Sequence, residues 1–267
     1  NGGTVTGGGT FVGEVAGATG SLITTAGNLT LGDSATNAFA TGGNIIVNSG
    51  DTLTLNDSGL AVLGLSTIID GGTLSAANGL SMSADDVLSG FGTVDGSLNV
   101  NGGTVTPGFD GGDSTQTLNI GDIDFGPNGT LIIELDGSGV PNIDLLNITG
   151  TVTIDPATNL IFADPNLGAP ILPGTAIVFI ANDDDGDSVM GNFAGLPEGT
   201  VVNLNGDRYH ITYQWGGTAR DGNDVAVVRN RIPEVNIDVP DTTENTPTTL
   251  SGTITNADGF DSHTVTI

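Results

Sequence analysis

The chain has 267 residues, enough for one large domain or two ordinary ones. Its 31 acidic residues face four arginines and no lysine, and the net charge of −27 disfavours binding to nucleic acid or to an anionic membrane surface. Because there is no cysteine, disulfides, thiolate metal sites and a cysteine nucleophile are excluded. No apolar run approaches the roughly 20 residues of a membrane helix, so direct membrane insertion is not expected.

Residues 1–116 carry an internal repeat, a Gly-Gly-Thr step followed by an apolar residue. It recurs at Gly2 to Val5, Gly8 to Phe11, Gly71 to Leu74 and Gly102 to Val105. Between these steps lie short alternating runs such as Leu53-Thr54-Leu55, which place apolar side chains on one face of a strand. Strands this short are stable only when strands from successive turns stack on one another. The pattern therefore predicts an all-β parallel β-helix, or solenoid, with turns of roughly 20 residues. An antiparallel sandwich is the alternative, but it would need longer strands and clearer hairpins.

Residues 117–230 are predicted to continue the β-helix and to form its β-rich C-terminal cap. The expected strands are longer here: Thr130 to Asp136, Leu145 to Ile154, Thr175 to Ala181, Val201 to Asn205, Tyr209 to Trp215 and Asp224 to Val228. Aromatic residues are concentrated in the same segment. A thicker, aromatic terminal layer would cover the open strand edge that a solenoid leaves at its last turn.

Residues 231–267 are predicted to begin a separate β-sandwich domain that is cut short at Ile267. The boundary is expected at Asn230 to Pro233. Two expected strands follow, at 248–255 and 263–267, around a turn at 256–259 that contains an Asp-Gly pair.

The run from Leu88 to Gly108 resembles the phrase that ends the β-helical passenger regions of bacterial autotransporters. It contains, in the family's order, Gly90-Phe91-Gly92-Thr93-Val94, Gly96-Ser97-Leu98-Asn99-Val100 and Pro107-Gly108. The resemblance covers roughly residues 1–230 and implies a right-handed β-helix displayed outside the cell, often adhesive. From Ile232 onward the chain departs from that family. Residues 252–267 instead resemble an immunoglobulin-like repeat of the polycystic-kidney-disease or cadherin-like kind, which favours a long multidomain secreted protein.

Catalysis is not expected, although parallel β-helices also house polysaccharide lyases and hydrolases. Lyases of this shape use a basic residue, whereas every arginine here lies at or beyond residue 208. Hydrolases use grouped carboxylates, and Asp85-Asp86 is the one adjacent pair within the repeats. Neighbouring strand residues point to opposite faces, so these two would share a site only in a loop. His210 and His263 are expected to be surface or packed strand residues.

The best candidate site is an acidic loop, for which calcium is the expected cofactor. Its carboxylates belong to Asp183, Asp184, Asp185 and Asp187. Four carboxylates this close repel one another, and a hard cation with oxygen ligands would relieve that repulsion. The spacing is not that of an EF-hand, and a solvated acidic loop is the alternative. Asp258 and Asp261 are weaker candidates.

We therefore expect a non-catalytic structural or adhesive repeat protein that is secreted or located at a bacterial cell surface. The β-helix would act as a stiff spacer or an adhesion surface. Its expected partners are a host or neighbouring cell surface, a glycan, or further copies of the chain. Two alternatives remain: a polysaccharide-binding or polysaccharide-cleaving β-helix protein, and a subunit of an extracellular filament or surface layer.

Overall fold

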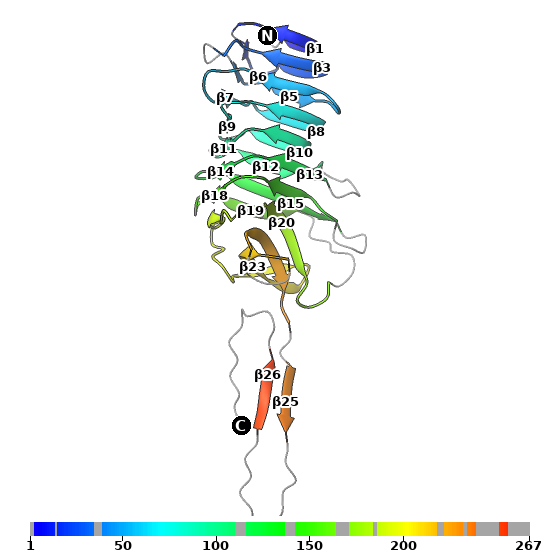
Figure 1. Cartoon of the computed structure of the whole chain (residues 1–267), viewed down its shortest axis with the longest axis vertical. Coiled ribbons are helices and arrows are strands. Elements are labelled where there is room, and N and C mark those ends of the chain that lie inside the picture. The colour runs from blue at the N-terminus through cyan, green and yellow to red at the C-terminus, as the bar shows by residue number, and fades with distance from the viewer. Residues whose placement is uncertain are drawn as a thin grey trace, which may run out of the picture.

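The computed structural model describes residues 3–13, 15–34, 39–109, 116–136, 142–163, 171–183, 186–217, 222–231, 234–238 and 251–255. Throughout these residues the regular structure is strand, and none is helix (Figure 1). The all-β prediction is confirmed. The strands are β1 Thr4–Phe11, β2 Val15–Gly17, β3 Leu22–Leu31, β4 Phe39–Thr41, β5 Asn44–Val47, β6 Thr52–Leu55, β7 Ala61–Val62, β8 Ser66–Ser75, β9 Leu80–Met82, β10 Val87–Asp95, β11 Leu98–Val100, β12 Thr104–Pro107, β13 Thr117–Ile120, β14 Ile123–Phe125, β15 Thr130–Asp136, β16 Asn142–Ile143, β17 Leu145–Ile148, β18 Val152–Ile154, β19 Asn159–Ala163, β20 Ala176–Asn182, β21 Met190–Gly191, β22 Val201–Leu204, β23 Asp207–Trp215, β24 Asp224–Arg229, β25 Glu234–Asp238 and β26 Ser251–Thr255.

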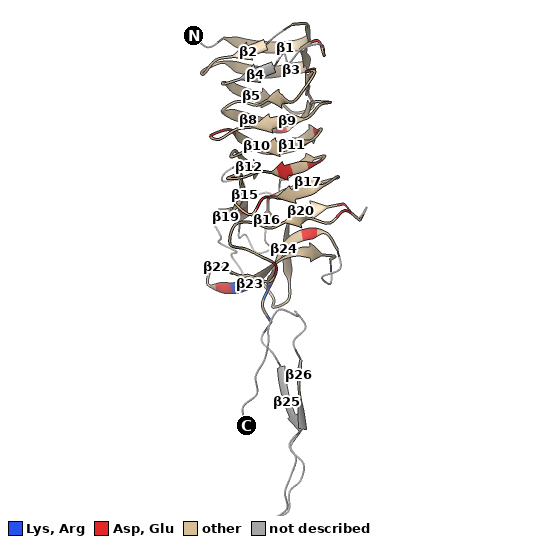
Figure 2. Ribbon diagram, turned by 90° about the vertical axis from the view of Figure 1, so that its left-hand side faces the viewer, with Lys and Arg blue, Asp and Glu red and all other residues tan. Residues whose placement is uncertain are grey.

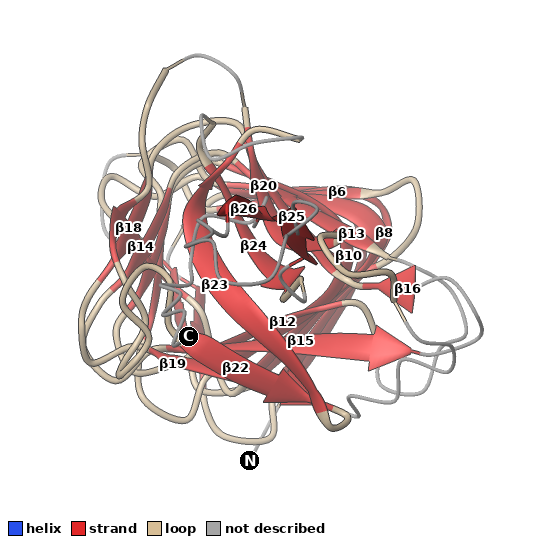
Figure 3. Cartoon of the chain, turned by 90° about the horizontal axis from the view of Figure 1, so that it is seen from below, coloured by secondary structure: helices blue, strands red, loops and turns tan. Residues whose placement is uncertain are grey.

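Most strands pair in parallel and form three rows. Row one contains β5, β12, β15 and β19, row two contains β6, β13, β17 and β20, and row three contains β2, β4, β7, β9, β11, β14, β18 and β21. The long strands β1, β3, β8 and β10 give their first halves to row one and their second halves to row two. Viewed along the stack, the three rows lie around one interior (Figure 3). The predicted parallel pairing is confirmed, and among the described residues of 3–13, 15–34 and 39–109 no two strands pair as a hairpin.

The register places aliphatic side chains above one another inside the stack. In row one Ile23 pairs with Ile45, and in row two Leu53 pairs with Leu74, which pairs with Val94. In row three Leu80 pairs with Leu98. Each of these side chains is at least 97% buried. Since strand side chains alternate, the Thr, Ser and Asn residues between them face outward. The apolar residues of each alternating run therefore lie inside the stack, and the polar residues lie outside it.

Glycines of the repeat lie at the corner between row one and row two inside β1, β8 and β10, whereas the Gly102-Gly103 pair lies in the turn that leads into row one at β12. Gly90 has φ +106, a conformation that L side chains rarely adopt, and a Cβ there would overlap the carbonyl oxygen of Ile69 on the neighbouring strand. The register between β8 and β10 shifts at this corner, between Phe91 and Thr93. Stacked backbones approach too closely here for any side chain, which is the physical reason for glycine.

One end of the stack is covered by antiparallel strands. β20 pairs with β24, β24 with β23 and β23 with β22, all antiparallel. Beneath them the rings of Phe179 and Tyr213 lie 6.5 and 6.2 Å from that of Phe193. The Tyr213 hydroxyl donates to the Leu196 carbonyl at 2.7 Å and accepts from the Phe193 backbone N–H at 3.0 Å. Burial raises the pKa of Tyr213 well above its ordinary value.

Two strand expectations need correction or addition. The strand expected from Leu145 to Ile154 is wrong as a single strand, because β17 ends at Ile148 and β18 begins at Val152. A corner separates them, where the Asp122 carboxylate accepts the Thr151 backbone N–H at 2.8 Å and its hydroxyl at 2.9 Å. Beyond residue 231, β26 pairs antiparallel with β25, a strand the sequence did not single out. Residues 256–267 lie outside the described residues.

Candidate functional site

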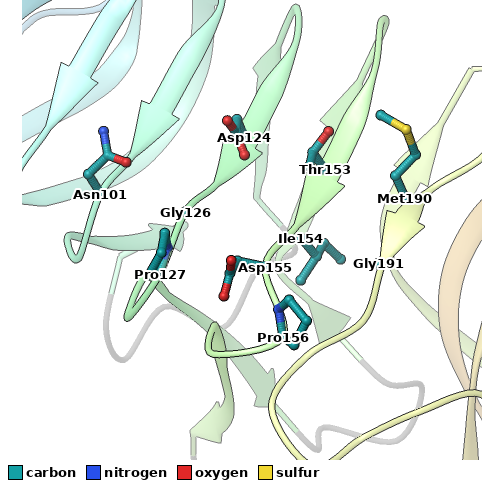
Figure 4. Close-up of a pocket in the computed structure, with 10 residues that line it drawn as sticks. All are labelled: Asn101, Asp124, Gly126, Pro127, Thr153, Ile154, Asp155, Pro156, Met190 and Gly191. Carbon is teal, nitrogen blue, oxygen red and sulfur yellow. The ribbon is translucent and has the colours of Figure 1, made fainter.

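A groove of about 420 Å³ lies on the outer surface of row three (Figure 4). It spans β14, β18 and β21, together with the turns that follow β11, β14 and β18. Its lining residues are Asn101, Asp124, Gly126, Pro127, Thr153, Ile154, Asp155, Pro156, Met190 and Gly191. These come from four turns of the chain, so the groove runs across neighbouring strands.

Strand register brings the outward side chains of the groove together. Asp124 pairs with Thr153, and Thr153 with Met190, so the three side chains stand side by side on one face. Neighbouring strands lie about 4.8 Å apart. The groove therefore offers an outward position at each strand, with a carboxylate, a hydroxyl and a thioether in succession (Figure 4).

A glycine at the corner after β14 makes room for the Asn101 side chain. Gly126 has no side chain, and a Cβ there would lie 2.6 Å from the Asn101 Oδ1. The Asn101 amide therefore lies over Gly126. On the next turn, Asp155 is held by the Ala157 backbone N–H, which donates to its Oδ1 at 2.8 Å. The groove is thus bordered by the Asn101 amide on one side and the Asp155 carboxylate on the other.

The groove is rich in hydrogen-bond acceptors. Asp124 and Asp155 are the titratable side chains among its lining residues, and Asn101 and Thr153 add an amide and a hydroxyl. Met190, which is 52% exposed, contributes an apolar surface together with two prolines. This combination suits a polyhydroxylated or cationic ligand. The sequence did not reveal the groove, because Asp124 is one of many outward polar residues in alternating strands.

The predicted calcium residues lie elsewhere, in the turn after β20, and the structure describes two of the four. The Asp183 backbone N–H donates to the Ile148 carbonyl at 3.1 Å, and the Asn223 amide donates to the carbonyl oxygens of Asp183 and, at 3.0 Å, of Asp187. Asp184 and Asp185 are outside the described residues. Within the ranges described, no three His, Cys, Asp or Glu side chains come together as a metal site.

One further atom in this turn bears on the calcium hypothesis. Asn182 is 94% buried, and its amide nitrogen donates to the Asp187 carbonyl at 3.2 Å. Its Oδ1 has no hydrogen-bond partner. A buried amide oxygen without a donor is costly, and oxygen atoms of this kind are ligands that Ca²⁺ accepts. Calcium therefore stays a hypothesis for this turn, with Asn182 as an added oxygen.

The residues weighed above for catalysis lie in a turn, in the case of Asp85 and Asp86, or buried on a strand, in the case of His210. Asp85 and Asp86 lie in a turn, where Asp86 is buried and accepts the Ser83 backbone N–H at 2.7 Å while Asp85 is exposed. His210 is 3% exposed on β23, with its Nδ1 3.0 Å from the Gly199 carbonyl oxygen. His263, Asp258 and Asp261 are outside the described residues.

The part of the chain that the structure describes holds no helix long and apolar enough to cross a membrane. No family model, no curated protein and no solved structure matches the chain.

Proposed function

We propose that the chain is a non-catalytic structural and adhesive repeat protein, secreted or located at a bacterial cell surface, whose stacked strands form a right-handed parallel β-helix. The observation that carries the proposal is the ladder of parallel pairs from β1 to β20 around one aliphatic interior. Hydrogen bonds that run along the stack join every turn to the next, which suits a stiff spacer. β20 to β24 would serve as its C-terminal cap.

The outer surface also fits such a role. An asparagine ladder runs along row two: Asn147 donates to the Asn119 Oδ1 at 2.9 Å, and Asn119 donates to the Gly92 carbonyl at 2.8 Å. Ladders of this kind tie turns together from outside. Described acidic residues are spread over the turns, whereas the described basic residues, Arg208, Arg229 and Arg231, lie at the β22–β24 end (Figure 2). A surface with this charge stays soluble without a covering partner.

A rod can be tested directly because the chain has no cysteine of its own. Spin labels at Thr19 and Asn205, both exposed and near opposite ends of the stack, would report the end-to-end distance. We expect one narrow distance distribution in electron paramagnetic resonance. A broad distribution would refute the stiff spacer.

Adhesion needs its own measurement. Beads that carry the folded chain should retain cells, and beads that carry the heat-unfolded chain should not. Equal retention by both would remove the adhesive part of the proposal.

The groove favours a second candidate function, which is binding or cleavage of a polysaccharide. Its acceptors Asp124 and Thr153 stand on neighbouring strands, about 4.8 Å apart, close to the length of one sugar residue in an extended polysaccharide. A glycan array would test binding, with Asp124→Ala as the variant that removes the central carboxylate. Release of reducing sugar ends from a bound glycan would indicate cleavage. Polymers that grow with concentration in electron micrographs would instead favour a filament or surface-layer subunit.

A further inference from the structure

The groove on row three carries negative charge that none of its lining residues balances. Among the ten residues that line it, Asp124 and Asp155 are acidic and none is Lys, Arg or His. The whole chain has a net charge of −27. The potential around the groove therefore attracts cationic ligands and repels acidic ones.

Strand register places the two carboxylates on either side of Gly126. The Asp155 backbone N–H donates to the Phe125 carbonyl at 2.8 Å, so Gly126, which follows Phe125, stands opposite Asp155. Asp124 precedes Gly126 by two residues on the same strand. In a regular pair of strands about 4.8 Å apart, with two residues spanning about 6.6 Å, the Cβ atoms of Asp124 and Asp155 lie about 8 Å apart.

A third oxygen belongs to Asn101, from the preceding turn of the chain. Its Oδ1 is 2.6 Å from the point where a Cβ of Gly126 would lie, so it fills the space over that glycine. The Ala157 backbone N–H donates to the Asp155 Oδ1 at 2.8 Å, which fixes this carboxylate and leaves its Oδ2 for a ligand. The oxygens of Asn101, Asp124 and Asp155 thus border one part of the groove (Figure 4).

Three acceptor oxygens match a protonated primary amine, which has three N–H donors. Its hydrogen bonds to carboxylates are charge-assisted and roughly twice as strong as neutral ones. A hydroxyl group of a neutral sugar has one donor and would leave both negative charges in place. A calcium ion fits less well, because it takes about six to eight oxygen ligands.

The rest of the groove favours a sugar over a basic peptide. Pro127, Pro156 and Met190 offer apolar surface to the C–H face of a sugar ring, and the Thr153 hydroxyl can bond to a ring hydroxyl. Asp124 and Thr153 stand about 4.8 Å apart, close to the length of one sugar residue. Side chains on one face of an extended peptide recur instead about every 6.6 Å.

We propose that the groove binds a polysaccharide whose sugars carry free, protonated amines, with one ammonium group between Asp124, Asp155 and Asn101. This ligand class rests on the polysaccharide function proposed for the groove and narrows it to cationic amino sugars. The polymer runs along the stack, across β14, β18 and β21.

Titration calorimetry with two oligosaccharides tests the ligand class. One is a β-linked glucosamine oligomer with free amines, and the other is its fully N-acetylated form of the same length. The acetylated oligomer should bind about tenfold or more weakly, because acetylation removes the charge that both carboxylates bond. Equal affinity for the two would overturn the amino-sugar proposal and still support polysaccharide binding. Failure of the free-amine oligomer to bind would also overturn the amino-sugar proposal, and the glycan array would decide polysaccharide binding separately.

Charge-matched variants locate the binding, since a chain this acidic attracts any polycation. Asp124→Asn and Asp155→Asn should each weaken the free-amine oligomer about tenfold or more, and the amide oxygen of the latter can still accept the Ala157 N–H. Asp85→Asn is the control, because Asp85 is exposed in a turn outside the groove, and it should change the affinity about twofold or less. Equal losses in all three variants would mean that net charge alone binds the oligomer, which would overturn the proposal. A lysine oligomer of equal length that bound as tightly, with the same loss in Asp124→Asn, would overturn it in favour of a basic peptide.

Discussion

Gly90→Ala should destabilise the chain far more than the same change at Gly50, and the difference measures how tightly the turns stack. Both glycines have positive φ, +106 at Gly90 and +77 at Gly50. At Gly50 a Cβ would have no atom within 4 Å, whereas at Gly90 it would overlap the Ile69 carbonyl oxygen. The two positions therefore share the conformational penalty and differ in the steric one.

The magnitudes follow from these two terms. A left-handed conformation costs a non-glycine residue about 1–2 kcal/mol, which is all that Gly50→Ala should lose. At Gly90 the overlap adds about 1–3 kcal/mol, as overpacking in a well-packed region usually does. Relief of the overlap would move the strand and strain the two hydrogen bonds between Gly90 and Gly108, of 2.9 and 2.8 Å. The expected loss at Gly90 is about 2–5 kcal/mol.

Thermal and urea unfolding, followed by circular dichroism, would measure both variants against the unmodified chain. For a chain of this size 1 kcal/mol shifts Tm by about 2–4 °C, so Gly90→Ala should melt roughly 2–12 °C below Gly50→Ala. If the two variants melted together, the close approach of β10 to β8 would be refuted, and with it the explanation of the Gly-rich phrase as a corner.

Three further outcomes are expected. Leu74→Ala should lower the free energy of unfolding by about 2–5 kcal/mol, because Leu74 is fully buried between Leu53 and Val94; Thr54→Ala, at an outward position, should change it by about 0.5 kcal/mol or less in the same urea titration. Burial raises the pKa of Tyr213, so the folded state keeps a proton that the unfolded chain loses above its ordinary value of 10.0. The stability that this proton contributes should be fully present below pH 10 and should fall as the pH rises beyond it. Tyr213→Phe should flatten the alkaline decline of Tm and should lower Tm at neutral pH. An equally steep alkaline decline in the variant would contradict Tyr213 as the cause. Millimolar Ca²⁺ should raise Tm relative to EDTA, and Asp187→Asn should reduce the rise; a melt that is the same with Ca²⁺ and EDTA would remove the calcium hypothesis.

The all-β class and the parallel pairing could be predicted from the sequence because they depend on local, repeated features. Leu53-Thr54-Leu55 alternates with the period of a strand, and the burial of Leu53 and Leu55 with Thr54 outward follows from that alternation. Short alternating runs of this kind recur between Gly-rich turns, as the strands of stacked turns of roughly 20 residues would. Neither inference requires knowledge of which turn contacts which other turn.

The groove was decided by the tertiary structure. Asn101, Asp124 and Asp155 are separated by 20 or more residues, and the turns between them differ in length, so no periodic rule aligns them. Their proximity follows from the register of β11, β14 and β18 and from the missing side chain at Gly126. Side-chain alternation is a property of each strand alone, whereas a site across strands depends on which residue pairs with which. Hydrogen bonding between distant turns sets that pairing, and only the folded chain contains it.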